Sequence, residues 1–270
     1  MTEERSYHEN MRTIAICNLK GGVAKTTTVI NLAADLAHDH SKRVLVIDAD
    51  SQANATEFLG GGREGHSLAT LLRMPAVERT SFSACFEATQ TICASNVRGV
   101  DLLPADDSLM DLDLSKAACG AAWVECLVEL KAASALKDYD FVLIDCPPAF
   151  NAAAAAALLA ADEVIIPIKL DAFALRGMAN LTRQIENMRK INPALRIGGV
   201  LPTMWYKAEE SEKAISALRG AGLTVYPRIR RSNRVDAMTY RQEPLIRTSP
   251  TSGACRDYRF FARQLAEGRC

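Results

Sequence analysis

Short apolar runs alternate along this chain with longer stretches whose apolar residues recur at helical spacing. Each run has four or five residues, and a strand buried on both faces reads as such a continuous apolar run. Parallel strands need helical crossovers between them. The alternation therefore predicts an α/β fold, a doubly wound and mostly parallel sheet with helices on both faces. The expected strands are residues 13–17, 43–47, 100–103, 141–144, 164–168 and 197–201, and the expected helices are residues 26–38, 123–136, 152–160, 175–191 and 209–218.

The composition is that of a globular protein that needs no disulfide bonds to fold. Of its 270 residues, 49 % are hydrophobic and 24 % are charged, and a chain of this length buries enough surface to fold without disulfides. We expect residues 11–270 to form a single domain and residues 1–10 to be a polar N-terminal extension. The eight cysteines include no C-x-x-C pair, so reduced thiols are expected. No apolar run reaches the roughly 20 residues that span a bilayer, and the N-terminus is polar, which favours a cytoplasmic protein.

A glycine-rich loop joins the first expected strand to the first expected helix. Small residues in such a loop let backbone N–H groups surround phosphate oxygens, and the start of the helix adds positive potential. The Lys25 ammonium can reach the β and γ phosphates of a nucleotide, and the Thr26 hydroxyl can bind Mg²⁺. A plain turn is the alternative, but the strand-to-helix placement and the Lys-Thr-Thr ending favour a nucleotide site. The residues of the loop are Lys20, Gly21, Gly22, Val23, Ala24, Lys25, Thr26 and Thr27.

This loop resembles the deviant Walker A box of the ParA/MinD group of ATPases. The triplets Asn-Leu-Lys and Asn-Leu-Ala extend the likeness to the ParA (Soj-like) partition proteins. Two later segments are similar to the D-x-D-P-Q-x-N-A-T and Y-D-x-x-x-x-D-C-P-P segments of that family. The resemblance implies a Mg²⁺-dependent ATPase with a P-loop NTPase fold. The matching segments are residues 18–20, 31–33, 46–56, 139–148, 167–177 and 199–204, within a likeness that covers about residues 11–265.

Two positions depart from the family pattern. Ala24 stands where a glycine usually precedes the Walker lysine, and Ser51 stands where the family has a proline. Alanine is tolerated at a negative φ but costs about 1 kcal/mol or more at a positive φ. The effect of Ala24 on nucleotide affinity therefore depends on the backbone conformation of the loop.

The resemblance assigns roles to the charged groups near the loop. Lys25 would hold the phosphates of its own subunit's ATP, Thr26 would bind the magnesium ion, and Asp145 would bind the same ion through water. Asp48 would lie near the ion and link hydrolysis to movement of its segment. Each of these carboxylates follows an expected strand, where an acid is otherwise often only the cap of the next helix.

Two further residues carry catalytic expectations. Lys20 matches the signature lysine of the family, which would reach across a nucleotide-sandwich dimer to the partner's ATP and stabilise charge in the transition state. Asp50 matches the family acid that orients the attacking water. Lys20, Lys25 and Asp50 are therefore the expected catalytic residues. By the same analogy, the expected adenine contacts are Met204, Pro227 and Ile229.

The charge of the chain is balanced overall but unevenly distributed. Basic and acidic residues number 32 each, whereas residues 191–270 hold 14 basic and 7 acidic side chains, a net charge of +7. Four arginines lie within residues 228–234, and guanidinium groups suit phosphodiester oxygens. No aromatic ladder accompanies them, which favours non-specific duplex binding over a solvated basic face paired with local acids. The expected DNA contacts are Arg219, Arg228, Arg230, Arg231 and Arg234.

Together these features imply a DNA partition ATPase of a plasmid, a mobile element or a chromosome. The arginine segment resembles the I-R-x-S-x-x-x-x-E-A region of partition ATPases, near which the ATP-bound dimer of that family binds DNA without sequence preference. The implied cofactors are ATP and Mg²⁺. The implied partners are a second copy of the chain, the duplex DNA of the nucleoid and a ParB-like centromere-binding protein that stimulates hydrolysis.

Two other functions are weaker alternatives. A MinD-like membrane-positioning ATPase needs a lysine-rich amphipathic helix at its C-terminus. Here Phe260, Phe261 and Leu265 have few flanking cations, so we expect this segment to dock on the protein and expect no membrane partner. The iron-sulfur relatives of the family need cluster ligands, and Cys93 and Cys126 lack ligand spacing.

Overall fold

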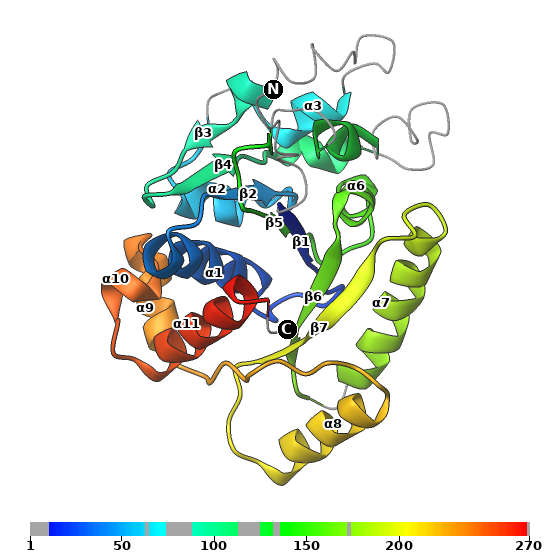
Figure 1. Ribbon diagram of the computed structural model, residues 1–270, viewed down its shortest axis with the longest axis vertical. Coiled ribbons are helices and arrows are strands. Elements are labelled where there is room, and N and C mark those ends of the chain that lie inside the picture. The colour runs from blue at the N-terminus through cyan, green and yellow to red at the C-terminus, as the bar shows by residue number, and fades with distance from the viewer. Residues whose placement is uncertain are drawn as a thin grey trace, which may run out of the picture.

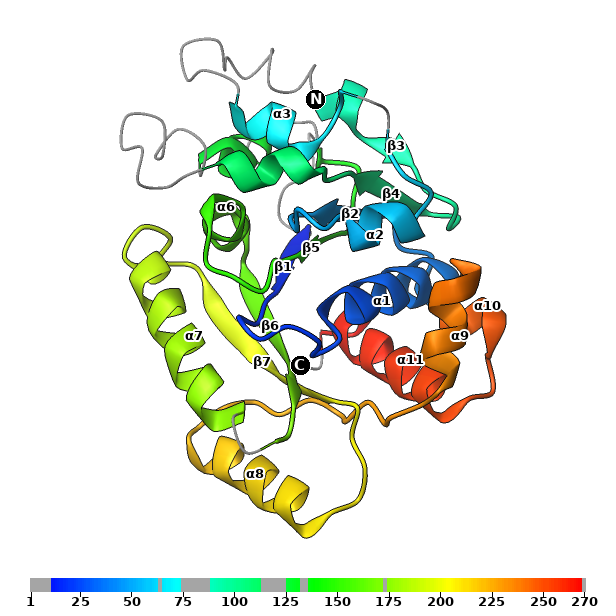
Figure 2. The same cartoon turned by 180° about the vertical axis from the view of Figure 1, so that it is seen from behind.

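A central sheet organises the molecule, as the sequence predicts. The computed structural model describes residues 11–62, 65–73, 88–112, 125–131, 136–171 and 174–268. Seven strands follow the order β3-β4-β2-β5-β1-β6-β7, and helices cover both faces of the sheet (Figures 1 and 2). All neighbouring strands are parallel except β3, which pairs antiparallel with β4 at the edge. The strands are β1 (Arg12–Ile16), β2 (Val44–Asp48), β3 (Cys93–Ala94), β4 (Val100–Leu103), β5 (Phe141–Asp145), β6 (Glu163–Lys169) and β7 (Arg196–Thr203).

The observed elements confirm the predicted alternation. All six expected strands and four expected helices are present, and each end lies within two residues of its predicted position. Strand β3 was not expected, because two residues show no periodicity. Within the fifth expected helix, the described residues 125–131 are helical; the expected extension of residues 1–10 lies outside the described residues. The helices are α1 (Lys25–His40), α2 (Asn54–Phe58), α3 (Leu68–Arg73), η1 (Asp107–Asp111), α6 (Ala152–Ala160), α7 (Ala174–Arg189), α8 (Glu209–Gly220), α9 (Arg234–Arg241), α10 (Leu245–Thr248) and α11 (Gly253–Ala266).

Two hydrophobic clusters bury the two faces of the sheet. Successive side chains of a strand point to opposite faces. In β1, Ile14 and Ile16 therefore join the cluster that contains residues of α1 and α11, whereas Ala15 joins the cluster that contains residues of α6 and α7. Every residue of β2 and β5 is buried, which explains why these strands are continuous apolar runs rather than alternating ones.

The last helix, α11, docks on the protein through its apolar face. Phe261 and Leu265 are buried in the cluster shared with α1, and the Tyr258 hydroxyl lies 3.2 Å from the Thr28 hydroxyl. Phe260 remains 51 % exposed. Most of the apolar surface of α11 is therefore already covered by protein. In the part of the chain that the structure describes, no helix is long and apolar enough to cross a membrane.

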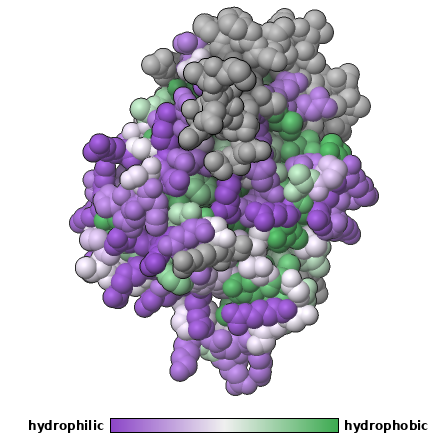
Figure 3. All heavy atoms as spheres, in the orientation of Figure 1, coloured by the Kyte–Doolittle hydropathy of each residue, from purple (hydrophilic) through white to green (hydrophobic). Residues whose placement is uncertain are grey.

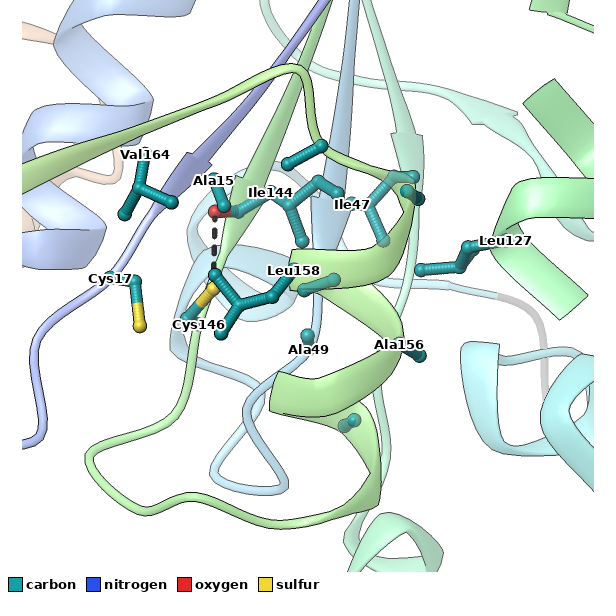
Figure 4. Packing of buried hydrophobic residues seen from close by; sticks show 14 of the residues in the cluster. Ala15, Cys17, Ile47, Ala49, Leu127, Ile144, Cys146, Ala156, Leu158 and Val164 are labelled. Atoms are coloured by element: carbon teal, nitrogen blue, oxygen red, sulfur yellow. Dashed lines mark hydrogen bonds between the residues drawn. The ribbon is translucent and has the colours of Figure 1, made fainter. Parts of the chain in front are cut away.

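The described cysteines are free thiols, as expected. Cys17 and Cys146 follow β1 and β5, and both are buried next to α6 (Figure 4). A hydrogen bond with Cys17, together with burial, raises the pKa of the Cys146 thiol well above its usual range. Such thiols are packing residues rather than nucleophiles. The free cysteines are Cys17, Cys93, Cys126, Cys146 and Cys255, whereas Cys85, Cys119 and Cys270 lie outside the described residues.

The carboxyl ends of three central strands meet at one edge of the sheet. Asp145 at the end of β5 is in register with Ile16 of β1 on one side and with Asp48 of β2 on the other. The loop that follows β1 therefore starts beside both carboxylates. Parallel sheets bind their ligands at this edge, so the fold brings the predicted loop and the predicted acids together.

Candidate active site

The glycine-rich loop between β1 and α1 is anchored to the ends of two other strands. The Asn18 side-chain amide donates to the Pro167 carbonyl at 2.7 Å, and its oxygen accepts the Lys20 N–H at 3.0 Å. The Thr203 hydroxyl donates to the Val23 carbonyl at 3.0 Å. Because β6 and β7 hold the loop in this way, its backbone N–H groups are positioned before any ligand binds.

Ala24 adopts the left-handed conformation, with φ of 66° and ψ of 36°. Its carbonyl accepts the Thr28 N–H at 3.0 Å and the Thr28 hydroxyl at 2.7 Å, which ties this conformation to the first turn of α1. The sequence left the sign of φ at this position open, and the structure gives a positive φ. A side chain at this position strains the backbone, whereas the glycine usual in the family would not.

Replacing Ala24 by glycine is expected to stabilise the protein by about 1 kcal/mol, because the left-handed strain disappears. This gain corresponds to a rise of about 2–4 °C in Tm, measured by thermal unfolding. Ala33→Gly in the interior of α1 is the matched control and should lower Tm instead, because glycine weakens a helix interior. An Ala24→Gly variant that unfolds at a lower temperature than the wild type would contradict the strain argument.

Lys25 begins α1 and is only 8 % exposed. Its ammonium donates to the Lys20 carbonyl at 3.3 Å. Among the described residues, no carboxylate lies within ion-pair distance of this ammonium. A buried cation without an acidic partner is costly, so this position favours an anionic ligand at the loop.

Two buried carboxylates lie beside Lys25. Asp145 is 1 % exposed, and neither of its carboxylate oxygens has a hydrogen-bond partner of ordinary distance and angle among the described residues. Burial and the charge of Asp48 raise the pKa of Asp145 well above its usual range, whereas the Thr26 hydroxyl and the Lys25 ammonium lower it. Burial likewise raises the pKa of Asp48 to about 6. Two adjacent buried acids, of which Asp145 has unsatisfied oxygens, fit a divalent cation, which takes oxygen ligands.

Asp48 also holds the segment that follows β2. Its carboxylate accepts the Asp50 N–H at 3.1 Å and both the N–H and the hydroxyl of Thr56 at 2.8 Å. Asp50 is half-buried, and its own carboxylate accepts the Gln52 N–H at 3.1 Å. A change in the charge near Asp48 would therefore alter the position of Asp50 through the backbone of this turn.

The signature lysine is held within its own chain. The Lys20 ammonium forms an ion pair with Asp171, which follows β6, and both side chains are partly exposed. The sequence analysis did not single out Asp171, although its position after a strand of the sheet was a usable signal. The pair lies at the same edge of the sheet as the loop.

A cavity of about 320 Å³ opens beside the loop. Ala24 and Thr27 line it on the loop side, and Met204 and Ile229 line it from the segments that follow β7 and α8. Tyr206, which the sequence analysis missed, adds an aromatic ring that is 58 % exposed. The volume and the mixed apolar and polar lining suit the base and sugar of a nucleotide.

Pro227, the third expected adenine contact, is placed elsewhere. It lines a separate cavity of about 610 Å³ next to α8. The chain from residue 225 to residue 231 runs extended beside β7 and contributes residues to both cavities. Ile229 lines the cavity beside the loop, and Pro227 lines the other one.

The five predicted DNA-binding arginines differ in their surroundings. Arg228 stacks on the Trp205 ring at 4.2 Å and forms an ion pair with Glu212. Arg230 binds the Asp257 carboxylate through two nitrogens at 2.7 and 2.6 Å. The remaining three have no carboxylate within ion-pair distance among the described residues, and the surface over α9, α10 and α11 is largely hydrophilic (Figure 3). These three are Arg219, Arg231 and Arg234.

Sequence comparison finds relatives of this chain among known proteins. The AAA domain family model AAA_31 matches residues 11–197. The "Chromosome partitioning protein ParA" of Caulobacter vibrioides is 38 % identical over 196 residues, which cover 72 % of this chain and 70 % of that protein. The "Chromosome-partitioning ATPase Soj" of Thermus thermophilus is 34 % identical over 262 residues, which cover 94 % of this chain and 95 % of that protein.

Solved structures share the fold along nearly the whole chain. Apo McdA of Cyanothece superposes with a TM-score of 0.77 at 26 % identity, covering 96 % of this chain and 100 % of that one. Cobyrinic acid a,c-diamide synthase of Mycobacterium smegmatis, with bound ADP and magnesium, gives a TM-score of 0.74 at 28 % identity, covering 96 % and 95 %. The cell division ATPase MinD of Pyrococcus furiosus, at 22 % identity and a TM-score of 0.74, covers 95 % and 98 % and shares the fold.

Proposed function

Because this chain belongs to the AAA-domain family of the ParA and Soj partition ATPases, we propose that it binds and hydrolyses ATP with Mg²⁺ to drive DNA partition. The observation that carries the proposal is a buried lysine with no carboxylate within ion-pair distance next to a buried aspartate whose oxygens have no hydrogen bond of ordinary geometry, both among the described residues. The Lys25 ammonium favours binding of an anion, and the Asp145 carboxylate favours binding of a cation. The two side chains lie next to each other at one edge of the sheet. Magnesium nucleotides supply both charges together.

Three residues suit the magnesium ion. Thr26 and Asp145 would hold it, and Asp48 would lie behind them with its oxygens already engaged by the turn after β2. When bound, the ion neutralises phosphate charge and orients the phosphate groups. The repulsion between the Asp48 and Asp145 carboxylates would decrease with a bound cation. The hydrogen bonds of Asp48 would transmit this change to Asp50.

The chain's own side chains supply the rest of the mechanism. Phosphoryl transfer to water needs positioning and charge neutralisation rather than a covalent nucleophile. Lys25 would hold the phosphates and Asp50 would orient the water. Lys20 would leave Asp171 and reach across an ATP-bound dimer to the partner's phosphates, which requires the nucleotide to form part of the dimer interface.

Partition requires that the ATP-bound dimer also hold DNA. We place duplex binding on the arginines that have no acidic partner, Arg219, Arg231 and Arg234, and leave Arg228 and Arg230 as residues that stabilise the local fold. Arg231 also lines the cavity beside the loop, so nucleotide binding and DNA binding share one segment. In this scheme residues 11–270 act as one domain on the nucleoid, and a ParB-like centromere-binding protein stimulates hydrolysis.

Replacing Arg231 and Arg234 by alanine tests the DNA-binding role. Without two phosphate contacts, the slope of log affinity against log salt should fall by about 1.8, equally on unrelated duplexes. The measurement is fluorescence anisotropy of labelled duplex DNA with saturating ATP, together with the ATP affinity of the variant. Arg183→Ala with Arg189→Ala on α7 removes the same charge from another surface and is the matched control. An unchanged salt slope would remove these arginines from the DNA-binding surface.

A further inference from the structure

A second cationic cleft lies at the opposite end of α1 from the nucleotide loop. It forms where the C-terminal end of α1 meets the turns before β2 and β4 and the short helix α10, and its volume is about 390 Å³. Helix α1 has 16 residues, which gives it a length of about 24 Å. A phosphate group bound in this cleft therefore cannot touch the glycine-rich loop.

The described charged residues that line the cleft are all basic. None of the described residues that line it is acidic, and five of them are basic. Three of the five already have acidic partners, because His38 lies 2.9 Å from Asp39, Lys42 pairs with Asp140 at 3.1 Å and Arg43 pairs with Asp138 at 3.7 Å. The basic residues are His38, Lys42, Arg43, Arg98 and Arg247, and they come from segments that are far apart in the sequence.

Arg98 and Arg247 remain without counter-charge. Both are exposed, and among the described residues no carboxylate lies within ion-pair distance of either guanidinium. Arg247 donates instead to the Asn96 carbonyl at 3.3 Å, which orients it beside the turn that carries Arg98. Like charges gathered in one concave site repel each other unless an anion binds between them.

The floor of the cleft is apolar and closely packed. Ala34 and Val97 are buried beneath it, and Gly99 adopts a φ of +82° at a place where a Cβ would lie only 3.2 Å from the Ala37 Cβ. The backbone turn before β4 therefore approaches α1 closely and sets Arg98 at the rim. Guanidinium groups above a rigid apolar surface can bind a phosphate group while the apolar surface contacts the ester carbon bonded to it.

We propose that this cleft binds a phosphate group, presented either by duplex DNA or by a small phosphate ester. The proposal is independent of the function of the nucleotide loop, since it uses none of the residues there. DNA would extend its contact surface onto α10 and the turn before β4. A small phosphate ester would occupy the cleft alone and lie at the far end of the helix that begins with Lys25.

Titration calorimetry with pyrophosphate tests the site directly. The wild type should bind pyrophosphate at the nucleotide loop and at the cleft, and Lys25→Ala should retain the cleft site alone. Adding Arg98→Ala and Arg247→Ala to Lys25→Ala should weaken the remaining binding by about 10-fold or more, because two charge-assisted contacts are lost. Arg98→Lys with Arg247→Lys should retain part of the affinity, and Arg183→Ala with Arg189→Ala should retain all of it.

Duplex DNA identifies the source of the phosphate. If DNA occupies the cleft, Arg98→Ala with Arg247→Ala should lower the salt slope of DNA binding by about 1.8 in the otherwise wild-type chain. Loss of pyrophosphate binding with an unchanged DNA slope supports the site and assigns it to a small ester. A variant that changes neither measurement overturns the proposal. Failure of the nucleotide site would show instead as unchanged ATP affinity in Lys25→Ala, which the cleft does not influence.

Discussion

Lys25→Ala is expected to lower the affinity for ATP by about 100-fold or more. The Lys25 ammonium is buried and has no acidic partner within ion-pair distance among the described residues, so it is available to bind the phosphates of ATP. Removing one member of a buried charge pair costs about 2–5 kcal/mol, which corresponds to this loss. The neighbouring Lys20 cannot substitute within the subunit, because Asp171 holds its ammonium.

Calorimetric titration with ATP and Mg²⁺ measures this effect. Lys190→Ala is the matched control, since that lysine is exposed just after α7 and its ammonium donates a hydrogen bond to the Asn187 side chain at 3.2 Å. The control should bind ATP as tightly as the wild type. Equal ATP affinity in Lys25→Ala and the wild type would remove the loop between β1 and α1 from nucleotide binding, and with it the proposed ATPase.

Asp50→Ala is expected to bind ATP normally but to hydrolyse it about 100-fold more slowly. A positioned carboxylate that orients or deprotonates the reacting water contributes at least this factor. ATP binding should persist because Lys25, Thr26 and Asp145 are untouched. Phosphate release at saturating ATP gives the rate, and titration gives the affinity.

The matched variant Asp50→Asn separates chemistry from structure. Asparagine keeps the oxygen that accepts the Gln52 N–H, so the turn after β2 is preserved while the charge is lost. We expect Asp50→Asn to be as slow as Asp50→Ala. A fast asparagine variant would show that Asp50 only shapes the turn, and wild-type rates in both variants would remove Asp50 from the mechanism. Asp107→Ala, an exposed acid on η1, should leave the rate unchanged.

Much of this protein could be predicted from the sequence because its strands are short and its crossovers are regular. Continuous apolar runs such as residues 141–144 indicate strands that are buried on both faces. Because these strands alternate with helices, a parallel sheet is the favoured arrangement. That topology places the ends of β1, β2 and β5 at one edge. The meeting of the glycine-rich loop with Asp48 and Asp145 was therefore predictable without coordinates.

The tertiary structure decided what local sequence cannot encode. The positive φ of Ala24 occurs in a loop that is anchored to β6 and β7 by contacts between distant segments. The pairing of Arg230 with Asp257 and the assembly of the cleft around Arg98 depend on which surfaces the packed helices bring together. Periodicity reports which face of an element is buried, whereas charge partners are set by the packing of elements far apart in the chain.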